Sequence, residues 1–212
     1  MAAASIKLKH LEILLSQLMP HPKPKLKLEE YTIDSKSATR MLYIAEYVNR
    51  DICNKHVIDL GCGTGRLAIG AALLGAAQVV GVDIDKENVT VARKNATEAK
   101  ADIEYIVGDI EAIHGPFDTT LTNPPFGSWN KGADISFLKK AMETSRIVYS
   151  LHKRTESNRR FLSQKITSFG GNVDSIHELE IIIPHTFKFH RKKSQNVKVD
   201  LYRIITGTKN GC

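Results

Sequence analysis

Cysteine is scarce in this sequence, and its pattern excludes several classes of protein. The 212 residues contain three cysteines, at positions 53, 62 and 212, without a Cys-x-x-Cys pair or the Cys/His spacing of a metal site. Small secreted domains use even numbers of cysteines in disulfides. We therefore expect a reducing compartment, the cytoplasm or, in a eukaryote, the nucleus, and no structural zinc within the chain.

Long apolar runs are missing as well. No stretch reaches the roughly 18 to 20 apolar residues that a membrane-spanning helix needs. From Met1 to Met19, leucine and isoleucine recur but charged residues interrupt them, which indicates an amphipathic helix rather than a signal peptide. The sequence argues against a membrane or secreted protein, and its length suits one domain with a full core.

The dinucleotide fingerprint G-x-G-x-x-G is absent, although glycines are concentrated in one loop. Gly61, Gly63 and Gly65 follow the apolar strand expected at 56–60, and Arg66 occupies the place of the third glycine of that fingerprint. Glycine lets the backbone pass close beneath a ligand, but this spacing disfavours a pyrophosphate. The loop predicts a nucleoside ligand without phosphates and argues against a nicotinamide dehydrogenase.

Three acids lie at the ends of the strands expected around this loop. Asp83 ends the second strand and is placed to accept both hydroxyls of a ribose, while Asp59 precedes the loop and Asp109 follows the third strand. One carboxylate suits a positively charged sulfonium, and another suits an adenine amine. S-adenosyl-L-methionine combines these groups and is the expected cofactor, with S-adenosyl-L-homocysteine as its product.

The turn Asn123-Pro124-Pro125-Phe126 is the candidate catalytic motif. Each proline holds φ near about −65° and lacks an N–H, so this turn after the strand expected at 117–122 is stiff. It can aim the Asn123 side-chain oxygen and the Pro124 carbonyl oxygen at the two hydrogens of one planar amine, while Phe126 offers a flat face to the ring. Accepting both hydrogens frees the nitrogen lone pair for an activated electrophile without a general base. The alternative is that the turn only ends a strand and that Phe126 belongs to the core.

Positive charge prevails over negative. The sequence contains 30 Lys and Arg residues against 23 acids, a formal charge of +7, which favours a polyanion such as nucleic acid, although ordinary solubility also explains it. A basic loop between the last two strands is expected to bind RNA, and the alternative is a solvated charge run. Its basic residues are Lys188, His190, Arg191, Lys192 and Lys193. The Pro/Lys stretch at 21–27 is either extended in solvent or lies along a polyanion.

Strands and helices alternate along the chain. Strands are expected at 56–60, 78–83, 103–107, 117–122, 147–151, 173–183 and 197–206, and helices at 35–49, 66–74, 84–99, 133–146 and 155–169. This order predicts an α/β fold. We expect a seven-stranded, mostly parallel sheet with a terminal antiparallel hairpin and helices on both faces.

The motifs resemble a known group of enzymes. The segment Asp59 to Gly65, Asp83, the pair Asp109-Ile110 and the turn Asn123 to Phe126 look like motifs of the Rossmann-like class I amino-methyltransferases. Over nearly the whole chain, the pattern resembles the methyltransferase-like-five family, whose members methylate adenine N6 in small-subunit ribosomal RNA. The wider match is carried by Lys23-Pro24-Lys25-Leu26, Leu28-Glu29-Glu30-Tyr31, Arg40-Met41-Leu42-Tyr43, Tyr149-Ser150-Leu151-His152-Lys153 and Lys188-Phe189-His190.

The resemblance implies a division of labour along the chain. Residues 1–50 form a helical and extended segment that packs on the core, and residues 51–212 form the methyltransferase domain. The catalytic residues are expected to be Asn123, Pro124, Pro125 and Phe126. Cofactor contacts are expected at Glu30, Ile33, Asp59, Gly61, Gly63, Thr64, Gly65, Asp83, Ile84, Asp109 and Ile110. Glu30 and Ile33 stand where the family usually has Gln and Thr, and Thr64 and Arg66 stand where relatives vary.

The resemblance also implies a partner. A small zinc-binding activator protein stabilises members of that family by adding a strand beside the third strand, which corresponds to residues 103–107 here. Those residues are apolar for an edge strand. The alternative is that the chain's own helices cover this strand.

Three other functions stay open at this point. A protein glutamine-N5 methyltransferase can use the same turn, but such enzymes usually have Tyr at the position of Phe126 and a larger helical N-terminal domain. A DNA adenine methyltransferase normally needs additional mass for sequence recognition. A non-catalytic RNA-binding module does not need an intact cofactor loop and catalytic turn.

Overall fold

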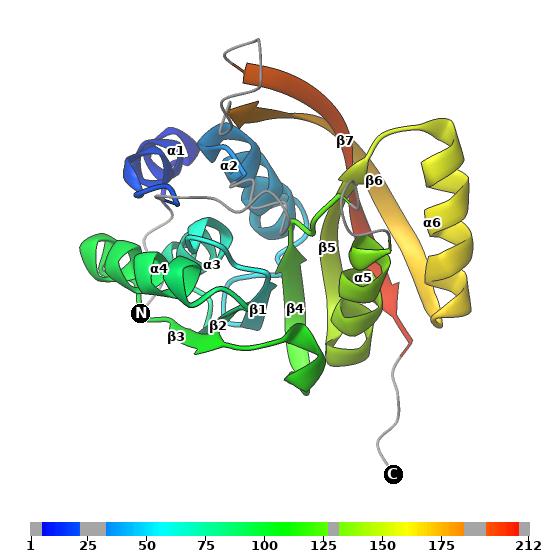
Figure 1. The fold of residues 1–212 in the computed structure, drawn as a ribbon, viewed down its shortest axis with the longest axis horizontal. Coiled ribbons are helices and arrows are strands. Elements are labelled where there is room, and N and C mark those ends of the chain that lie inside the picture. Colours follow the sequence, from blue (N-terminus) through cyan, green and yellow to red (C-terminus); the bar gives the residue numbers. More distant parts are fainter. Residues whose placement is uncertain (1–5, 22–32, 127–131, 185–193, 208–212) are drawn as a thin grey trace.

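The structure of the chain is a computed structural model, described here for residues 6–21, 33–126, 132–184 and 194–207 (Figure 1). Two helices, α1 (Leu8–Gln17) and α2 (Ser35–Tyr43), precede the sheet, and α2 continues into the π-helical turn η2 (Ile44–Val48). Asp34 caps α2, because its Oδ1 atom accepts a hydrogen bond of 3.0 Å from the Ser37 N–H. None of the helices within the described ranges is long and apolar enough to cross a membrane.

The expected alternation of strands and helices follows α2. The elements are β1 (His56–Leu60), α3 (Arg66–Leu73), β2 (Gln78–Asp83), α4 (Lys86–Ala99), β3 (Glu104–Val107), η3 (Ile110–Ala112), β4 (Phe117–Thr122), α5 (Ala133–Thr144), β5 (Ser145–Lys153), α6 (Glu156–Ser168), β6 (Gly171–Pro184) and β7 (Ser194–Thr206).

The seven strands form one sheet in the order β3-β2-β1-β4-β5-β7-β6. Neighbouring strands are parallel from β3 to β5, whereas β7 runs antiparallel to both β5 and β6. The predicted mostly parallel sheet with a terminal antiparallel hairpin is confirmed. The chain winds outward in one direction from β1 and in the other from β4, so the crevice at the carboxyl ends of these two adjacent strands is where open α/β sheets bind ligands.

Helices cover both faces of this sheet. Because side chains alternate along a strand, Val57 points into the cluster formed with α1, α2, α3 and α4, while Ile58 points into the cluster formed with α5 and α6. Leu11 and Leu15 of α1 are fully buried in the first cluster. Burying a leucine side chain contributes about 1.5–3 kcal/mol, so the N-terminal helices are part of the main core rather than an appendage.

The last two strands extend beyond their neighbours and curve toward α2 (Figure 1). The contact is specific, because Asp34 Oδ2 accepts a hydrogen bond of 2.9 Å from the Ile182 N–H, and the Ser37 hydroxyl donates to the Glu180 carbonyl oxygen at 3.0 Å. The N-terminal segment is thereby attached to the C-terminal hairpin.

Some predicted boundaries differ from the observed ones. The helix expected to end at residue 146 ends at Thr144, and β5 begins at Ser145 rather than at residue 147. Contacts from other strands explain the change, since the Ser145 hydroxyl lies 2.6 Å from that of Thr120, and the Ser145 carbonyl oxygen accepts from the Thr206 hydroxyl at 2.8 Å. β6 and β7 are also longer than predicted, because they pair with each other along almost their whole length.

Candidate functional site

The loop between β1 and α3 has the backbone geometry that its glycines allow. Gly61, Gly63 and Gly65 have φ angles of 70°, 53° and 87°, a region that other residues rarely occupy. A Cβ atom on Gly65 would lie 2.4 Å from the Tyr105 hydroxyl, so the loop rests directly on that ring. A Cβ atom on Gly63 would meet nothing within 4 Å, which leaves open space for a ligand above the backbone.

Asp83, at the end of β2, braces the glycine loop. One carboxylate oxygen accepts a hydrogen bond of 2.8 Å from the Gly63 N–H, and the other accepts from the Asp85 N–H at 2.8 Å and from Asn88 Nδ2 at 3.2 Å. Burial raises the pKa of Asp83, and these hydrogen bonds oppose the rise. A carboxylate oxygen has more than one lone pair, so Asp83 can hold the loop and still accept from a ribose hydroxyl.

Asp59 lies beneath the loop rather than on its surface. Gly65, the N-cap residue of α3, has no side chain to cap the helix, and Asp59 Oδ2 instead accepts from the Ala68 N–H at 3.0 Å. Its Oδ1 atom is buried and has no hydrogen-bond partner among the described residues. Burial, together with the nearby Asp83 charge, raises the pKa of Asp59 to about 7 against the effect of that hydrogen bond.

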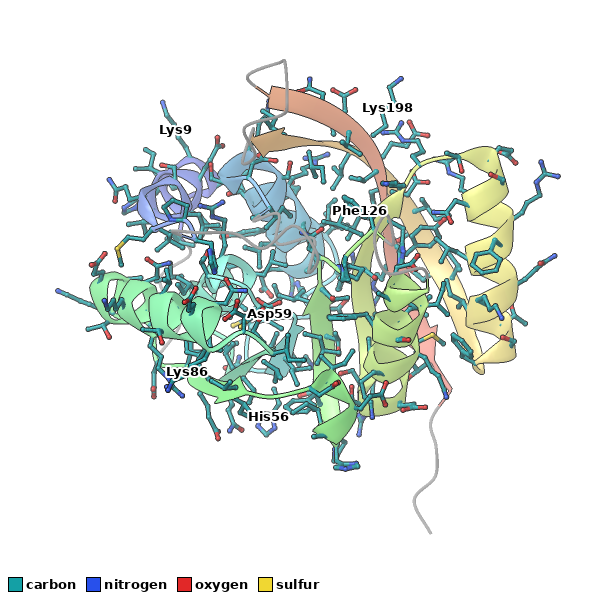
Figure 2. All side chains as sticks on the ribbon, viewed as in Figure 1. Lys9, His56, Asp59, Lys86, Phe126 and Lys198 are labelled. Atoms are coloured by element: carbon teal, nitrogen blue, oxygen red, sulfur yellow. The ribbon has the colours of Figure 1, made fainter. Side chains whose placement is uncertain are left out.

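The proline turn follows β4 next to this loop. The last residue of β4, Thr122, is paired with Leu60 of β1 on one side and with Ser150 of β5 on the other. Beyond it, Pro124 is buried and Phe126 is half-buried. The Lys153 ammonium group lies 5.6 Å from the centroid of the Phe126 ring. Figure 2 labels Phe126 near the end of β4 and Asp59 in the interior of the molecule.

The other expected cofactor residues surround the loop in different ways. The Ile84 side chain is 60% exposed although it is large and apolar, as expected for a group that covers a flat ligand. Ile110 is buried, and Asp109 is exposed and accepts from the Glu111 N–H at 2.9 Å. Ile33 and Thr64 are buried, and the Thr64 hydroxyl oxygen has no hydrogen-bond partner among the described residues.

Several predicted site residues lie outside the described residues. One is Glu30, expected to contact the cofactor. The others are the five basic residues of the expected RNA-binding loop, Lys188, His190, Arg191, Lys192 and Lys193, which fall between β6 and β7.

Sequence reasoning missed three residues that support the site. Asn95 of α4 is fully buried, accepts from the Met19 N–H at 2.8 Å, and donates to the carbonyl oxygens of Met19 and Thr64 at 3.0 and 2.9 Å. Tyr105 of β3 carries the loop at Gly65, and Arg66 of α3 donates to the Ile33 carbonyl oxygen. An asparagine within the apolar face of a helix was the available signal for the first residue. Nothing local pointed to the others.

A buried polar group lies near the proline turn. His152, at the end of β5, has its Nε2 atom 2.9 Å from the Ser150 hydroxyl and its Nδ1 atom 3.8 Å from the Asp134 carboxylate. Burial opposes ionisation of Asp134, but His152 outweighs it and holds the pKa of Asp134 below its ordinary value. Ser150 is 0% exposed, so this Ser-His-Asp arrangement offers no nucleophile to a substrate.

The residues at this crevice fit S-adenosyl-L-methionine. Buried polar atoms of Asp59 and Thr64 lack partners within the described part of the chain, the backbone is open at Gly63, and Asp83 places a carboxylate beside the loop. This arrangement favours a cationic nucleoside over a phosphorylated one.

Comparison with known proteins agrees with this assignment. A family model described as a methyltransferase domain matches residues 53–201. The chain is 40% identical to the rRNA N6-adenosine-methyltransferase METTL5 of Danio rerio, over 94% of this chain and 99% of that protein. The chain belongs to the METTL5 methyltransferase family.

Other similar proteins also match this chain over nearly its whole length. An uncharacterized protein of Methanocaldococcus jannaschii is 40% identical over 94% of both chains. A crystal structure of a Pyrococcus horikoshii protein, proposed to be an RNA methyltransferase, superposes with a TM-score of 0.88 at 39% identity and covers 96% of this chain and 99% of that one. The match therefore extends from the N-terminal helices to the terminal hairpin.

Proposed function

We propose that this methyltransferase transfers the methyl group of S-adenosyl-L-methionine to the exocyclic N6 amine of an adenosine in structured RNA, specifically small-subunit ribosomal RNA. The observation that carries the proposal is the pairing of Thr122 with Leu60. This register sets the turn from Asn123 to Phe126 beside the glycine loop, at the carboxyl ends of the parallel strands, where open α/β sheets bind ligands. The relationship to the METTL5 proteins supports the choice of RNA and of adenine N6.

The chain's own residues have distinct tasks in this reaction. Bound S-adenosyl-L-methionine would supply an electrophilic methyl group, and Asp83, Ile84 and Gly63 would hold its nucleoside part. The target adenosine leaves its stack, as other base-modifying enzymes require, and its ring lies on Phe126. Asn123 Oδ1 and the Pro124 carbonyl oxygen accept hydrogen bonds from the two N6 hydrogens, which favours a pyramidal nitrogen and frees its lone pair from the ring. Holding the amine in line with the methyl group then accounts for most of the decrease in the activation free energy. Once the methyl group is attached, one N6 proton is lost to water.

Lys153 strengthens this stacking arrangement. Its ammonium group lies over the Phe126 ring, and a cation near an aromatic face is attracted by about 0.5–1 kcal/mol at an exposed site. The basic residues at 188–193 are proposed from the sequence to add phosphate contacts.

The edge strand β3 is the proposed docking site of a small zinc-binding activator protein. In the described sheet, β3 has β2 as its one neighbour, and Val107 is 44% exposed. A hollow of about 360 Å³, lined by residues that include Leu73, Val79 and Ile103, lies beside the start of this strand. An edge strand with one free side suits a partner that adds one strand, and the hollow beside it, which also includes Lys100, Asp102 and Glu104, offers that partner charged as well as apolar contacts.

The cellular setting and the division of the chain follow from this proposal. A reducing compartment suits Cys53 and Cys62, which are free thiols, and we place the protein in the cytoplasm or, in a eukaryote, the nucleus. We also propose that residues 51–212 form the methyltransferase domain and that residues 1–50 form a segment that packs on its core, as the burial of Leu11 and Leu15 supports.

Methyl transfer from labelled S-adenosyl-L-methionine to small-subunit ribosomal RNA tests the function. The reaction is run with and without a zinc-binding partner, and the RNA is digested for nucleoside analysis. Label in N6-methyladenosine at one site is the expected result. Label in a release-factor-like protein but not in RNA would instead identify a glutamine methyltransferase, and cofactor binding without transfer to any substrate would identify a non-catalytic RNA-binding module.

A further inference from the structure

Arg66 is a basic side chain held at the rim of the cofactor loop. It is the first residue of α3, directly after Gly65, and its Nη1 atom donates a hydrogen bond to the carbonyl oxygen of Ile33. The guanidinium group therefore lies between the glycine loop and the N-terminal segment that leads into α2. The contact with a carbonyl oxygen fixes its orientation but does not neutralise its charge.

The rest of this guanidinium group is poorly satisfied by the protein. The Nε atom is buried and has no hydrogen-bond partner among the residues that the structure describes. Burial lowers the pKa of Arg66, and the Asp34 charge opposes this only in part. A cation at the N-terminal end of a helix is also disfavoured by the helix dipole. Arg66 thus costs the isolated protein stability, which indicates that its role lies outside the folded chain itself.

The unsatisfied edge has the shape of an anion site. In a guanidinium group, the Nε–H and one Nη2–H are parallel and match the two oxygens of a carboxylate. Nη1 is already engaged by Ile33, so the Nε–Nη2 edge is the one available for a ligand. Anions also bind at helix N-termini, and Gly65 offers α3 no side-chain cap. The Arg66 guanidinium group and the N-terminus of α3 therefore both favour an anionic group.

S-adenosyl-L-methionine has a single anionic group, the α-carboxylate of its methionine part. Its adenosine is assigned to Gly63, Asp83 and Ile84, and the Asp83 carboxylate repels the anionic group of the cofactor rather than binding it. We propose that Arg66 is a cofactor-specificity residue that binds this α-carboxylate through its Nε–Nη2 edge. The proposal rests on the proposed function, since it requires S-adenosyl-L-methionine as the cofactor.

A pair of ligands tests the proposal without measuring turnover. S-adenosyl-L-homocysteine has the carboxylate, whereas 5′-methylthioadenosine keeps the adenosine and the sulfur but lacks the amino acid. Isothermal titration gives the dissociation constant of each ligand for the intact protein and for Arg66→Met. We expect the substitution to weaken S-adenosyl-L-homocysteine at least about 10-fold, because hydrogen bonds to charged groups are the strong ones, and to change 5′-methylthioadenosine less than about 2-fold.

Two further variants separate binding from folding. Lys86→Met removes a charge from the exposed first residue of the next helix, α4 (Figure 2), and should leave both dissociation constants unchanged. Arg66→Lys keeps a charge but not the two-pronged edge, and should recover only part of the affinity for S-adenosyl-L-homocysteine. It also provides the test if Arg66→Met fails to fold.

Three results would overturn the assignment. Equal weakening of both ligands by Arg66→Met would mean that Arg66 only supports the loop through Ile33. Unchanged binding of both ligands, with weaker binding of RNA, would make Arg66 a phosphate contact. Failure of the unmodified protein to bind either ligand would refute the cofactor assignment itself, and so is distinguishable from a failure of Arg66 alone.

Discussion

The buried carboxylate of Asp59 should make stability depend on pH in an unusual direction. Its pKa rises from 3.8 to about 7 in the folded protein because burial penalises the charged form. Between these two values the native state holds a proton that the unfolded state has lost, so the free energy of unfolding falls as pH rises. Each unit of pKa difference corresponds to about 1.4 kcal/mol. Relative to a pH below 3.8, ionisation of this carboxylate therefore lowers the free energy of unfolding by about 4 kcal/mol above pH 7.

Asp59→Asn removes this dependence with little change of shape. The amide oxygen can still accept from the Ala68 N–H, and the amide is neutral at every pH used. Between pH 5 and pH 8, the stability of Asp59→Asn relative to wild type should rise by roughly 2 to 3 kcal/mol. Most of that change falls between pH 5 and pH 7.

Urea unfolding followed by circular dichroism at pH 5, 6, 7 and 8 measures this difference. Asp102→Asn, which removes an exposed carboxylate, is the control and should follow the wild type at every pH. A difference between Asp59→Asn and wild type that is the same at all four values would refute the reasoning. It would mean that Asp59 is ionised throughout and that the buried oxygen has a charged or hydrogen-bonded partner.

The remaining predictions concern binding and catalysis. Asn123→Ala should abolish methyl transfer while the dissociation constant of S-adenosyl-L-homocysteine changes less than about 3-fold, because the residue acts on the substrate amine; substantial surviving turnover would show otherwise. Asp83→Ala should first weaken cofactor binding, by roughly 10-fold or more, since it removes charged acceptors from the loop, and calorimetry detects this. Asn95→Ala should lower the free energy of unfolding by roughly 3 kcal/mol, because it leaves buried peptide groups unsatisfied; urea unfolding with an unchanged midpoint would contradict it. Neutralising the basic residues at 191–193 should weaken RNA binding and flatten its salt dependence, and an identical slope in a filter-binding titration would dismiss the loop.

The sequence predicted the parts of the fold that local pattern and spacing determine. The strand ending at Asp59 and Leu60, the glycine loop and the strand ending at Asp83 were all expected where they occur, because apolar runs and glycines mark them directly. The parallel sheet with its terminal hairpin followed from the alternation of elements. The turn from Asn123 to Phe126 was expected after a strand, where it occurs, because its two prolines mark the end of β4 directly.

The missed features depend on contacts between distant segments. Ser145 joins β5 because Thr120 and Thr206 bind it from neighbouring strands, and no local pattern contains that information. Asn95 looks like an ordinary polar helix residue until Met19 and Thr64 are seen to lie against it. Likewise, the burial of Asp59, its hydrogen bond to α3 and its raised pKa appear only when α3 is placed over β1.

Tyr105 connects the edge strand β3 to the glycine loop. Its hydroxyl lies under Gly65, while its carbonyl oxygen accepts a hydrogen bond of 2.7 Å from Arg93. The Gly108 N–H donates to the Asp83 carbonyl oxygen in β2, so by alternation the peptide groups of Tyr105 face away from the sheet. A chain that pairs with β3 must displace Arg93 and form hydrogen bonds with the peptide groups of Tyr105, the residue whose ring supports the glycine loop. The affinity for such a partner chain and the affinity for the cofactor are then thermodynamically linked. The partner changes the dissociation constant of the cofactor by the same factor by which the cofactor changes that of the partner.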